Sequence, residues 1–329
     1  MTPLHHQIRR TIRKYELCPP GTRVLVGLSG GADSVALTLL LQELAATEGF
    51  TVVGVAHLNH RLRPTAGRDE QFCRDFAAQA GLPIAVESMD VSGYAASQRL
   101  STEDAARRLR YDFLHRTAGR VEAGRIAVGH TRDDQAETVL LKLIRGAGLT
   151  GLAGIHPRRG AVVRPLLDVA RTDLRSYLRE RGHAWVEDES NQDLDNPRNR
   201  IRRLVLPELD RAYGGVTTPA IARAAALIRE DAAYLDDASE RRYIEVSALR
   251  PDGLEIDAAA LRTDPAPLQR RVLLKALRAV SGGREVGMDH VETAAQVLAG
   301  TCGPMDAPGC RVELRRGKLV LSNQGGSPR

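Results

Sequence analysis

The sequence predicts an α/β fold with a doubly wound parallel sheet, followed by a smaller α+β domain, and two observations carry this prediction. In the first half of the 329-residue chain, short apolar runs alternate with helix-length segments, as they do where helices connect parallel strands. After about residue 215, helical segments follow one another and an alternating hairpin comes last. At roughly 150 residues per domain, the length favours about two domains. We expect a main domain at residues 1–215, a linker helix at 216–245 and a small domain at 246–329.

The expected strands are apolar runs bounded by glycine or other turn residues, which is typical of buried strands. They lie at residues 23–28, 51–57, 83–87, 125–130 and 162–167, and the last of them would close the sheet. Helices are expected at residues 34–46, 65–80, 101–118 and 133–145. Ser101 and Asp104 give the third helix an N-capping pattern, and Gly81 is well placed to end the second.

The second half contributes three further helices and a hairpin. A long helix is predicted over residues 218–242, with Pro219 in its first turn, where proline is tolerated. Two more are expected at residues 268–280 and 289–298. Residues 311–322 alternate on both sides of Arg316-Gly317 and predict a β-hairpin. We expect the tail, residues 324–329, to be disordered.

Composition excludes several classes of protein. Hydrophobic residues make up 43% of the sequence and charged residues 27%, as in ordinary globular proteins. No apolar run approaches the length of about 18 residues that a membrane helix needs, and no apolar stretch follows the basic N-terminus, so we expect a cytoplasmic protein without a secretory signal. The four cysteines lack a zinc-binding spacing and are expected to be reduced thiols.

Positive charge is concentrated in two places, although the net charge is only +6. Residues 9–14 carry three arginines and a lysine, and residues 198–203 carry four arginines in six positions. Localised positive charge on a mixed surface favours a polyanionic partner such as nucleic acid. For the second cluster, the alternative is a solvated helix start whose arginines pair with Glu187, Asp188 or Glu189.

The strongest chemical signal is the loop Ser29-Gly30-Gly31-Ala32-Asp33-Ser34, which follows the first strand and opens the first helix. A nucleotide phosphate is bound by backbone N–H groups at a helix N-terminus, where the helix dipole favours an anion. The two glycines allow the backbone to approach closely. Asp33 repels a phosphate directly, so we expect it to act through Mg²⁺. The alternative is a plain glycine-rich turn.

Further motifs follow the loop in the chain. They occupy residues 57–63 (HLNHRLR), 106–111 (ARRLRY), 129–138 (GHTRDDQAET), 145–148 (RGAG), 164–166 (RPL), 185–191 (WVEDESN) and 199–207 (NRIRRLVLP). With the loop, and in this order, they resemble the tRNA(Ile)-lysidine synthetases, a group within the PP-loop, or N-type, ATP pyrophosphatases. The resemblance covers residues 20–210 strongly and the C-terminal domain more weakly. Larger members of the family carry a further C-terminal domain.

The resemblance implies a PP-loop ATPase fold, similar to the adenine nucleotide alpha hydrolases, over residues 1–215, and a small tRNA-binding domain over 246–329. It implies that ATP adenylates the C2 oxygen of the wobble cytidine (anticodon position 34) in an isoleucine tRNA with a CAU anticodon, with release of pyrophosphate. The ε-amine of free L-lysine then attacks C2 and expels AMP, which leaves lysidine. The implied cofactors are ATP and Mg²⁺; no membrane partner is implied, and a homodimer is left open.

The resemblance also assigns roles to individual residues. Catalysis would fall to Asp33, Asp134 and Arg107. Nucleotide binding would fall to Ser29, Gly30, Gly31, Ala32, Asp33, Ser34, His57 and His130, with Asp33 holding Mg²⁺ through the phosphates. Lysine and tRNA would be bound by Asp133, Asp134, Glu137, Arg107, Arg110, Arg198 and Arg203. Because only about one lysine amine in 2,500 is neutral at pH 7, a group in the site must take a proton, and Asp134 or Glu137 is a candidate.

Each assignment has a structural alternative. His57 and His60 have the spacing of metal ligands, or serve the fold, although their place after a strand favours a loop that faces nucleotide or tRNA. Arg107 and Arg110 share a helical face with Tyr111 that would otherwise be solvated. Asp133 and Asp134 would otherwise cap a helix. The glycines of residues 146–151 match a dinucleotide-binding pattern, but no strand precedes them, so we reject that interpretation.

Two rival functions remain. A PP-loop tRNA thiolase would need catalytic cysteines or an iron–sulfur set, and none of the four cysteines lies in such a pattern. The other rival is a noncatalytic, nucleotide-dependent RNA-binding protein. Such a protein would not need the intact loop together with Asp133 and Asp134, so their presence argues against this alternative.

Overall fold

The computed structural model describes residues 2–61, 65–187 and 193–323 and divides the chain into two compact units, Met1–Ile228 and Arg229–Arg329. The division falls within helix α11 (Thr217–Val246). The predicted boundaries at 215 and 245 lie near the two ends of this helix, and they stay a prediction. In the described ranges, no helix is both long and apolar enough to cross a membrane.

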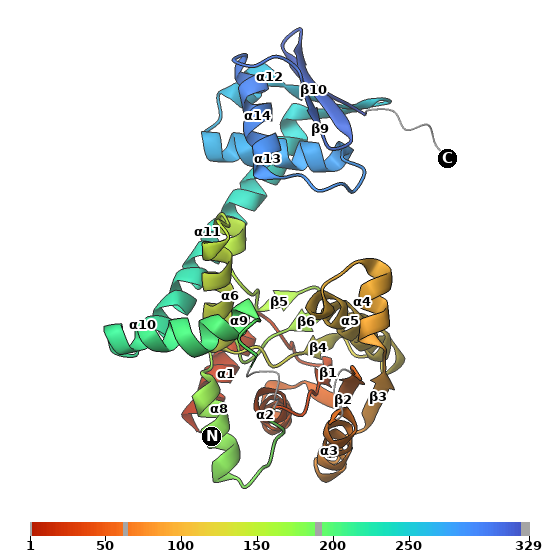
Figure 1. The fold of residues 1–329 in the computed structure, drawn as a ribbon, viewed down its shortest axis with the longest axis vertical. Coiled ribbons are helices and arrows are strands. Elements are labelled where there is room, and N and C mark those ends of the chain that lie inside the picture. Colours follow the sequence, from red (N-terminus) through yellow and green to blue (C-terminus); the bar gives the residue numbers. More distant parts are fainter. Residues whose placement is uncertain (1, 62–64, 188–192, 324–329) are drawn as a thin grey trace. The chain divides into compact units, whose positions relative to one another are not determined.

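The first unit is built on a six-stranded sheet with the order β3-β2-β1-β4-β6-β5 (Figure 1). The strands are β1 (Arg23–Gly27), β2 (Thr51–Asn59), β3 (Ile84–Ser88), β4 (Arg125–Ala127), β5 (Arg158–Arg159) and β6 (Val162–Val163). All neighbouring pairs are parallel except β5 and β6. The predicted α/β class with a doubly wound, mostly parallel sheet is therefore confirmed.

The prediction that residues 162–167 close the sheet is wrong. The strand there is only two residues long, and β5 lies outside it as an antiparallel edge strand. Pro165 has no backbone N–H to donate to a neighbouring strand, which ends the ladder just after β6.

Helices cover both faces of this sheet because successive residues of a strand point to opposite sides. Val24 and Val26 of β1 pack with helices on one face, among them α1 and α2, whereas Leu25 packs against α5 on the other. Figure 1 shows α2 and α3 on the opposite side of the sheet from α4 and α5. The helices are α1 (Pro3–Lys14), α2 (Ala32–Glu48), α3 (Ala66–Gln79), α4 (Val91–Gln98), α5 (Thr102–Arg120), α6 (Arg132–Ile144), α7 (Leu149–Leu152) and α8 (Arg171–Glu180).

The segment after residue 193 forms a helical extension of the first unit. It consists of α9 (Pro197–Arg200), one wider turn, η2 (Ile201–Val205), and α10 (Leu206–Tyr213). Ile201 and Leu206 pack on Ala136 of α6, and Asn196 caps α9 by accepting a hydrogen bond from the Arg198 N–H. This packing carries the basic cluster at 198–203 to the side of α6.

The second unit contains a five-stranded antiparallel sheet with the order β7-β8-β11-β10-β9. Its strands are β7 (Ser247–Arg250), β8 (Gly253–Asp257), β9 (Met305–Ala307), β10 (Cys310–Arg315) and β11 (Lys318–Asn323), and its helices are α12 (Ala258–Arg262), α13 (Ala266–Val280) and α14 (Met288–Ala299). The predicted hairpin is confirmed, since Arg315 pairs with Lys318 around a two-residue turn. Arg316 and Gly317 both have positive φ there, as such turns require. The tail 324–329 lies outside the described residues.

Candidate active site

The loop Ser29–Ser34 joins β1 to α2 and leaves the N-terminus of that helix open. Gly31 is the N-cap residue and offers no side-chain cap, so the N–H groups of Ala32 and Asp33 remain available to an anion, whereas the Ser34 N–H donates to the Gly31 carbonyl at 3.1 Å. The loop is closed from within: Ser34 Oγ accepts a hydrogen bond from the Ser29 N–H at 3.1 Å and donates to the Gly31 carbonyl at 2.9 Å. This arrangement suits a phosphate group held by backbone amides.

Gly30 is required by both its conformation and its surroundings. Its φ of +85° lies in the left-handed region, and a Cβ atom there would stand 3.3 Å from Cys73 Sγ. Gly129, just after β4, is constrained by its surroundings alone, because a Cβ atom there would lie 3.1 Å from the backbone of Asp33. The segment that carries His130 is thus pressed directly against the phosphate loop.

A single arginine, Arg171 at the start of α8, contacts all four predicted acidic site residues. Its side chain reaches Asp33 Oδ2 at 3.2 Å, Asp134 Oδ1 at 2.9 Å and Glu137 Oε1 at 3.4 Å. Its backbone N–H donates to Asp133 Oδ2 at 2.9 Å. Asp33 belongs to the phosphate loop and the other three residues to α6, so Arg171 joins the two parts of the predicted site.

Two more arginines surround Glu137, whose side chain is completely buried. Arg198 Nε lies 3.0 Å from Glu137 Oε2, and Arg202 Nε lies 2.6 Å from Oε1. Arg198 also donates to Thr138 Oγ1 at 2.8 Å, and Arg202 reaches Asp134 Oδ1 at 3.4 Å. The acidic side chains of α6 therefore stand in a cage of three arginines.

The sequence prediction for Arg198 needs a correction. From the resemblance we expected Arg198 and Arg203 to bind lysine or tRNA at the surface, but Arg198 turns inward to Glu137 with its side chain only 27% exposed. Arg200 and Arg203 are the exposed members. The alternative pairing with Glu187 is also wrong, because Glu187 pairs with Arg175; Asp188 and Glu189 lie outside the described residues.

Asp134 serves two purposes at once. Its Oδ2 accepts hydrogen bonds from the Thr131 N–H at 2.8 Å and the Thr131 hydroxyl at 2.9 Å, which caps α6. Its Oδ1 faces Arg171 and Arg202. The capping alternative and the site assignment are thus compatible, because each uses a different oxygen.

The two aspartates at the centre of the site have opposite pKa shifts. Burial raises the pKa of Asp33 to about 6, against the opposing effect of Arg171, and Asp33 Oδ1 is buried without a hydrogen-bond partner. Burial would also raise the pKa of Asp134, but Arg171 and the other positive neighbours outweigh it and bring the value to about 2. Asp134 therefore keeps its charge in the whole working range, whereas Asp33 can exchange a proton near neutrality.

The two predicted histidines are held neutral. Burial lowers the pKa of His57, whose Nδ1 lies 3.0 Å from the Leu28 carbonyl oxygen and 3.3 Å from Cys73 Sγ. Those contacts place His57 behind the phosphate loop as a supporting residue. Burial is the main cause that lowers the pKa of His130 to about 3. Nearby arginines lower this pKa further, whereas Asp134 raises it. In the described ranges, no group of three or more His, Cys, Asp or Glu side chains is arranged to hold a metal ion.

Arg107 and Arg110 both lie on α5 beside Tyr111, with their guanidinium carbons 5.3 and 5.4 Å from the centre of its ring. Arg107 is exposed, and its described contacts do not join it to the carboxylate cluster, whereas Arg110 is half-buried and its Nε atom is buried. The structure thus brings Asp33, Asp133, Asp134 and Glu137 together and leaves Arg107 apart from them.

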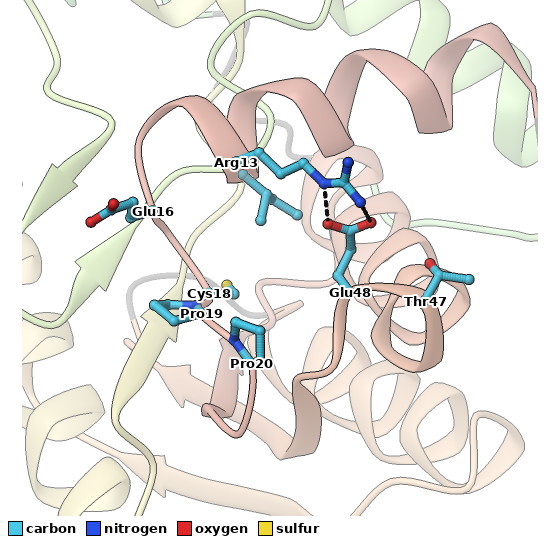
Figure 2. A pocket seen from close by; sticks show the side chains of 8 residues that line it. Arg13, Glu16, Cys18, Pro19, Pro20, Thr47 and Glu48 are labelled. Atoms are coloured by element: carbon cyan, nitrogen blue, oxygen red, sulfur yellow. Dashed lines mark hydrogen bonds and ion pairs between the residues drawn. The ribbon is translucent and has the colours of Figure 1, made fainter.

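Figure 2 shows a pocket elsewhere on the first unit, lined by Ile12, Arg13, Glu16, Cys18, Pro19, Pro20, Thr47 and Glu48. Arg13 and Arg9 both pair with Glu48 there, so these two members of the N-terminal basic cluster have partners within the chain. None of the lining residues is a predicted site residue.

Sequence reasoning missed Arg171 as a site residue. One signal was present: Arg171 follows the RPL motif at 164–166 at the beginning of an amphipathic helix in which Leu174, Tyr177 and Leu178 share the buried face. Its partners are separated from it by 34 to 138 residues, so only the fold shows that they meet.

Comparison with known proteins shows which families and proteins this chain is similar to. The PP-loop domain family matches residues 3–209. The tRNA(Ile)-lysidine synthase of Chlorobaculum tepidum is 32% identical over 95% of this chain and 94% of its own length. The corresponding protein of Symbiobacterium thermophilum is 36% identical over 96% of this chain and 68% of its own length, and that of Geobacter sulfurreducens is 39% identical over 89% and 62%.

The chain spans less than two thirds of some of these relatives, such as the Geobacter protein. Among solved structures, the U34-tRNA thiolase NcsA from Methanococcus maripaludis, with its [4Fe-4S] cluster, has a similar fold. The TM-score is 0.56 at 16% identity, over 69% of this chain and 78% of that one. On the sequence matches, this chain belongs to the tRNA(Ile)-lysidine synthase family and contains its PP-loop domain.

Proposed function

We propose that this protein ligates free L-lysine to C2 of the wobble cytidine in a CAU-anticodon isoleucine tRNA, using ATP and releasing AMP and pyrophosphate. The observation that supports it most is the contact of Arg171 with both Asp33 and the carboxylates of α6. The expected phosphate-binding loop and the carboxylates of α6 thus lie side by side, which supports a reaction between an activated base and the amine of lysine.

In the first step, the open N–H groups of α2 bind the phosphates of ATP and stabilise the charge that develops on the leaving pyrophosphate. Asp33 fits a role in holding Mg²⁺, because its buried Oδ1 has no other partner. When bound, that ion would neutralise phosphate charge. The cytidine lies in a single-stranded anticodon loop, so it can be turned into the site at modest cost.

In the second step, Asp134 binds and orients the lysine side chain, while Glu137, which is completely buried, holds Arg171, Arg198 and Arg202 in place around it. The low pKa of Asp134, about 2, keeps its carboxylate charged, so that it attracts the ε-ammonium group of lysine. The same low pKa makes this carboxylate a weak acceptor for the ammonium proton. We therefore assign Asp134 to lysine binding, in place of the proton-accepting role considered from the sequence. The arginine cage fixes both carboxylates, so that they are already oriented when the substrate arrives.

The exposed arginines of the helical extension, Arg200 and Arg203, are proposed to contact the phosphate backbone of the tRNA. The second unit, Arg229–Arg329, is proposed to bind another part of the same tRNA.

The experiment is incubation of the purified protein with labelled lysine, Mg²⁺·ATP and either isoleucine or methionine tRNA transcripts that share the CAU anticodon. The proposal predicts label in the isoleucine tRNA, dependent on ATP, and AMP in equal amount. Glu137→Gln should reduce labelling strongly while ATP binding persists. Sulfur incorporation from a sulfide donor, with no lysine transfer, would favour the thiolase, whose reaction the three buried cysteines Cys18, Cys73 and Cys310 do not suit.

A further inference from the structure

Two arginines at the edge of the site, the buried Arg164 and the half-buried Arg110, differ from the three of the cage because neither pairs with a carboxylate. Arg164 is only 5% exposed; its Nη1 donates to the His156 carbonyl at 2.8 Å and its Nη2 to the Tyr111 hydroxyl at 3.4 Å. Its Nε is buried and has no hydrogen-bond partner. Within the described ranges, no acidic side chain forms an ion pair with it.

Arg110 also lies beside Tyr111. Its guanidinium lies 5.4 Å from the centre of the tyrosine ring, its Nε is buried without a partner, and no described carboxylate neutralises it. A cation that is partly or fully removed from solvent and has no counter-ion is unfavourable. A protein retains such a pair where a ligand supplies the missing negative charge.

Two neighbouring groups respond to the positive potential of this pair. Burial raises the pKa of Tyr111, but Arg110 and Arg164 outweigh burial and leave the pKa below its ordinary value. For His130, burial is the main cause of its low pKa, and Arg164 and Arg110 lower it further against the effect of Asp134. The surroundings of Tyr111 thus favour an anion and disfavour a second cation.

The position of the pair indicates which anion it receives. Arg164 directly follows β6, and His130 follows β4 at the segment that Gly129 presses against the phosphate loop. The pair therefore lies at the carboxyl ends of the strands, where α/β sheets bind ligands. The exposed Arg107, one helical turn before Arg110, continues the positive face outward along α5.

We propose that Arg110 and Arg164, with the Tyr111 hydroxyl, bind one backbone phosphate of the RNA substrate near the nucleotide that reacts. The loop Ser29–Ser34 already provides for the phosphates of ATP, and a positive face that runs from solvent to this pair suits a polymer rather than a small nucleotide. The inference rests on the proposed function, because the RNA is the substrate that function requires.

The test measures RNA and ATP binding separately, without catalysis, for the full chain and its Arg110→Gln and Arg164→Gln variants. The probes are an anticodon stem-loop RNA with a CAU anticodon and Mg²⁺·ATP. Each variant should weaken RNA binding about tenfold or more, the effect of one charge-assisted hydrogen bond. The slope of log affinity against log salt should flatten by about 0.7 for each phosphate that the variant no longer neutralises. ATP affinity should be unchanged.

Arg108→Gln is the matched control, since Arg108 is exposed on the same helix, and it should change RNA affinity much less. The ligand-free Arg110→Gln variant should melt no lower than the parent protein, because it removes an unpaired, half-buried charge. If Arg164→Gln does not fold, Tyr111→Phe removes one proposed hydrogen bond and retains the ring.

Unchanged RNA affinity and salt slope in Arg110→Gln would overturn the inference, as would a loss of ATP affinity with RNA binding intact. A parallel assay of lysine transfer by the parent protein separates the two proposals. If that protein forms lysidine while the variants bind RNA normally, only the phosphate site is refuted.

Discussion

Arg171→Gln tests the view that one arginine holds the two halves of the site together. The substitution removes a guanidinium that contacts Asp33, Asp134 and Glu137 and leaves their charges close to one another. Breaking a buried ion pair by deleting one partner typically costs about 3–5 kcal/mol. Asp134 and Glu137 keep Arg202, and Glu137 keeps Arg198, so we expect the lower end of that range.

A loss of about 3 kcal/mol should lower the melting temperature of a unit of this size by about 6–12 °C. The loss should also depend on pH. Arg171 holds the pKa of Asp33 below the value that burial alone would give, so its removal raises that pKa above about 6. Below that pH Asp33 is protonated with or without Arg171, so the part of the loss due to Asp33 should shrink as the pH falls from 8 to 5.

The assay is thermal unfolding of both proteins at pH 8 and pH 5, monitored by circular dichroism. Arg175→Gln on the same helix is the matched control, because its pair with Glu187 is exposed and should contribute only about 0–1 kcal/mol. If Arg171→Gln costs no more than Arg175→Gln, Arg171 does not hold the acidic residues together and our account of the site is wrong.

Three further predictions follow from the same geometry. Asp33→Asn should raise the stability of the ligand-free protein at pH 7 but not at pH 4, because the raised pKa of about 6 means that ionisation of Asp33 costs stability as the pH rises through that value. The affinity for Mg²⁺·ATP, measured by calorimetry, should be lower in the variant, and in the parent protein it should fall as the pH falls below about 6. Affinity for Mg²⁺·ATP equal to that of the parent would exclude the metal role. The double variant Arg200→Ala/Arg203→Ala should weaken tRNA binding and flatten its salt slope without lowering the melting temperature, whereas Arg198→Ala should lower the melting temperature. The reverse pattern in both assays would show that our correction for Arg198 is mistaken. Replacement of all four cysteines by alanine should leave lysine transfer per folded molecule intact, and its loss in a folded variant would revive the thiolase alternative.

The fold and the phosphate loop could be predicted from sequence because their signals are local. A glycine pair between a strand and a helix marks the loop, and alternation of apolar runs marks the sheet. Helix α1 is absent from the predicted elements, although Ile8 and Ile12 are spaced four residues apart and both are buried. Two apolar residues in a segment rich in arginine are only a weak signal for an amphipathic helix. The charged residues dominate the segment, so its sequence pattern indicates a charged surface rather than a helix.

The arrangement of charges could not be predicted, because it depends on residues far apart in the sequence. Arg198 has the sequence context of a surface arginine, yet the packing of Ile201 and Leu206 on α6 turns it toward Glu137, 61 residues earlier. The opposite pKa shifts of Asp33 and Asp134 have the same origin, since they depend on how much each is buried and on which arginines the fold brings close. Residue type and spacing alone do not contain that information.

The most direct test of the central claim is mass analysis of the isoleucine tRNA, digested to nucleosides, after incubation with the protein, Mg²⁺·ATP and L-lysine. Our account predicts that the wobble cytidine alone gains the mass of one lysine less one water, and that the gain requires both ATP and lysine. A tRNA of unchanged mass, under conditions in which the protein is folded and binds ATP, would contradict the proposed activity.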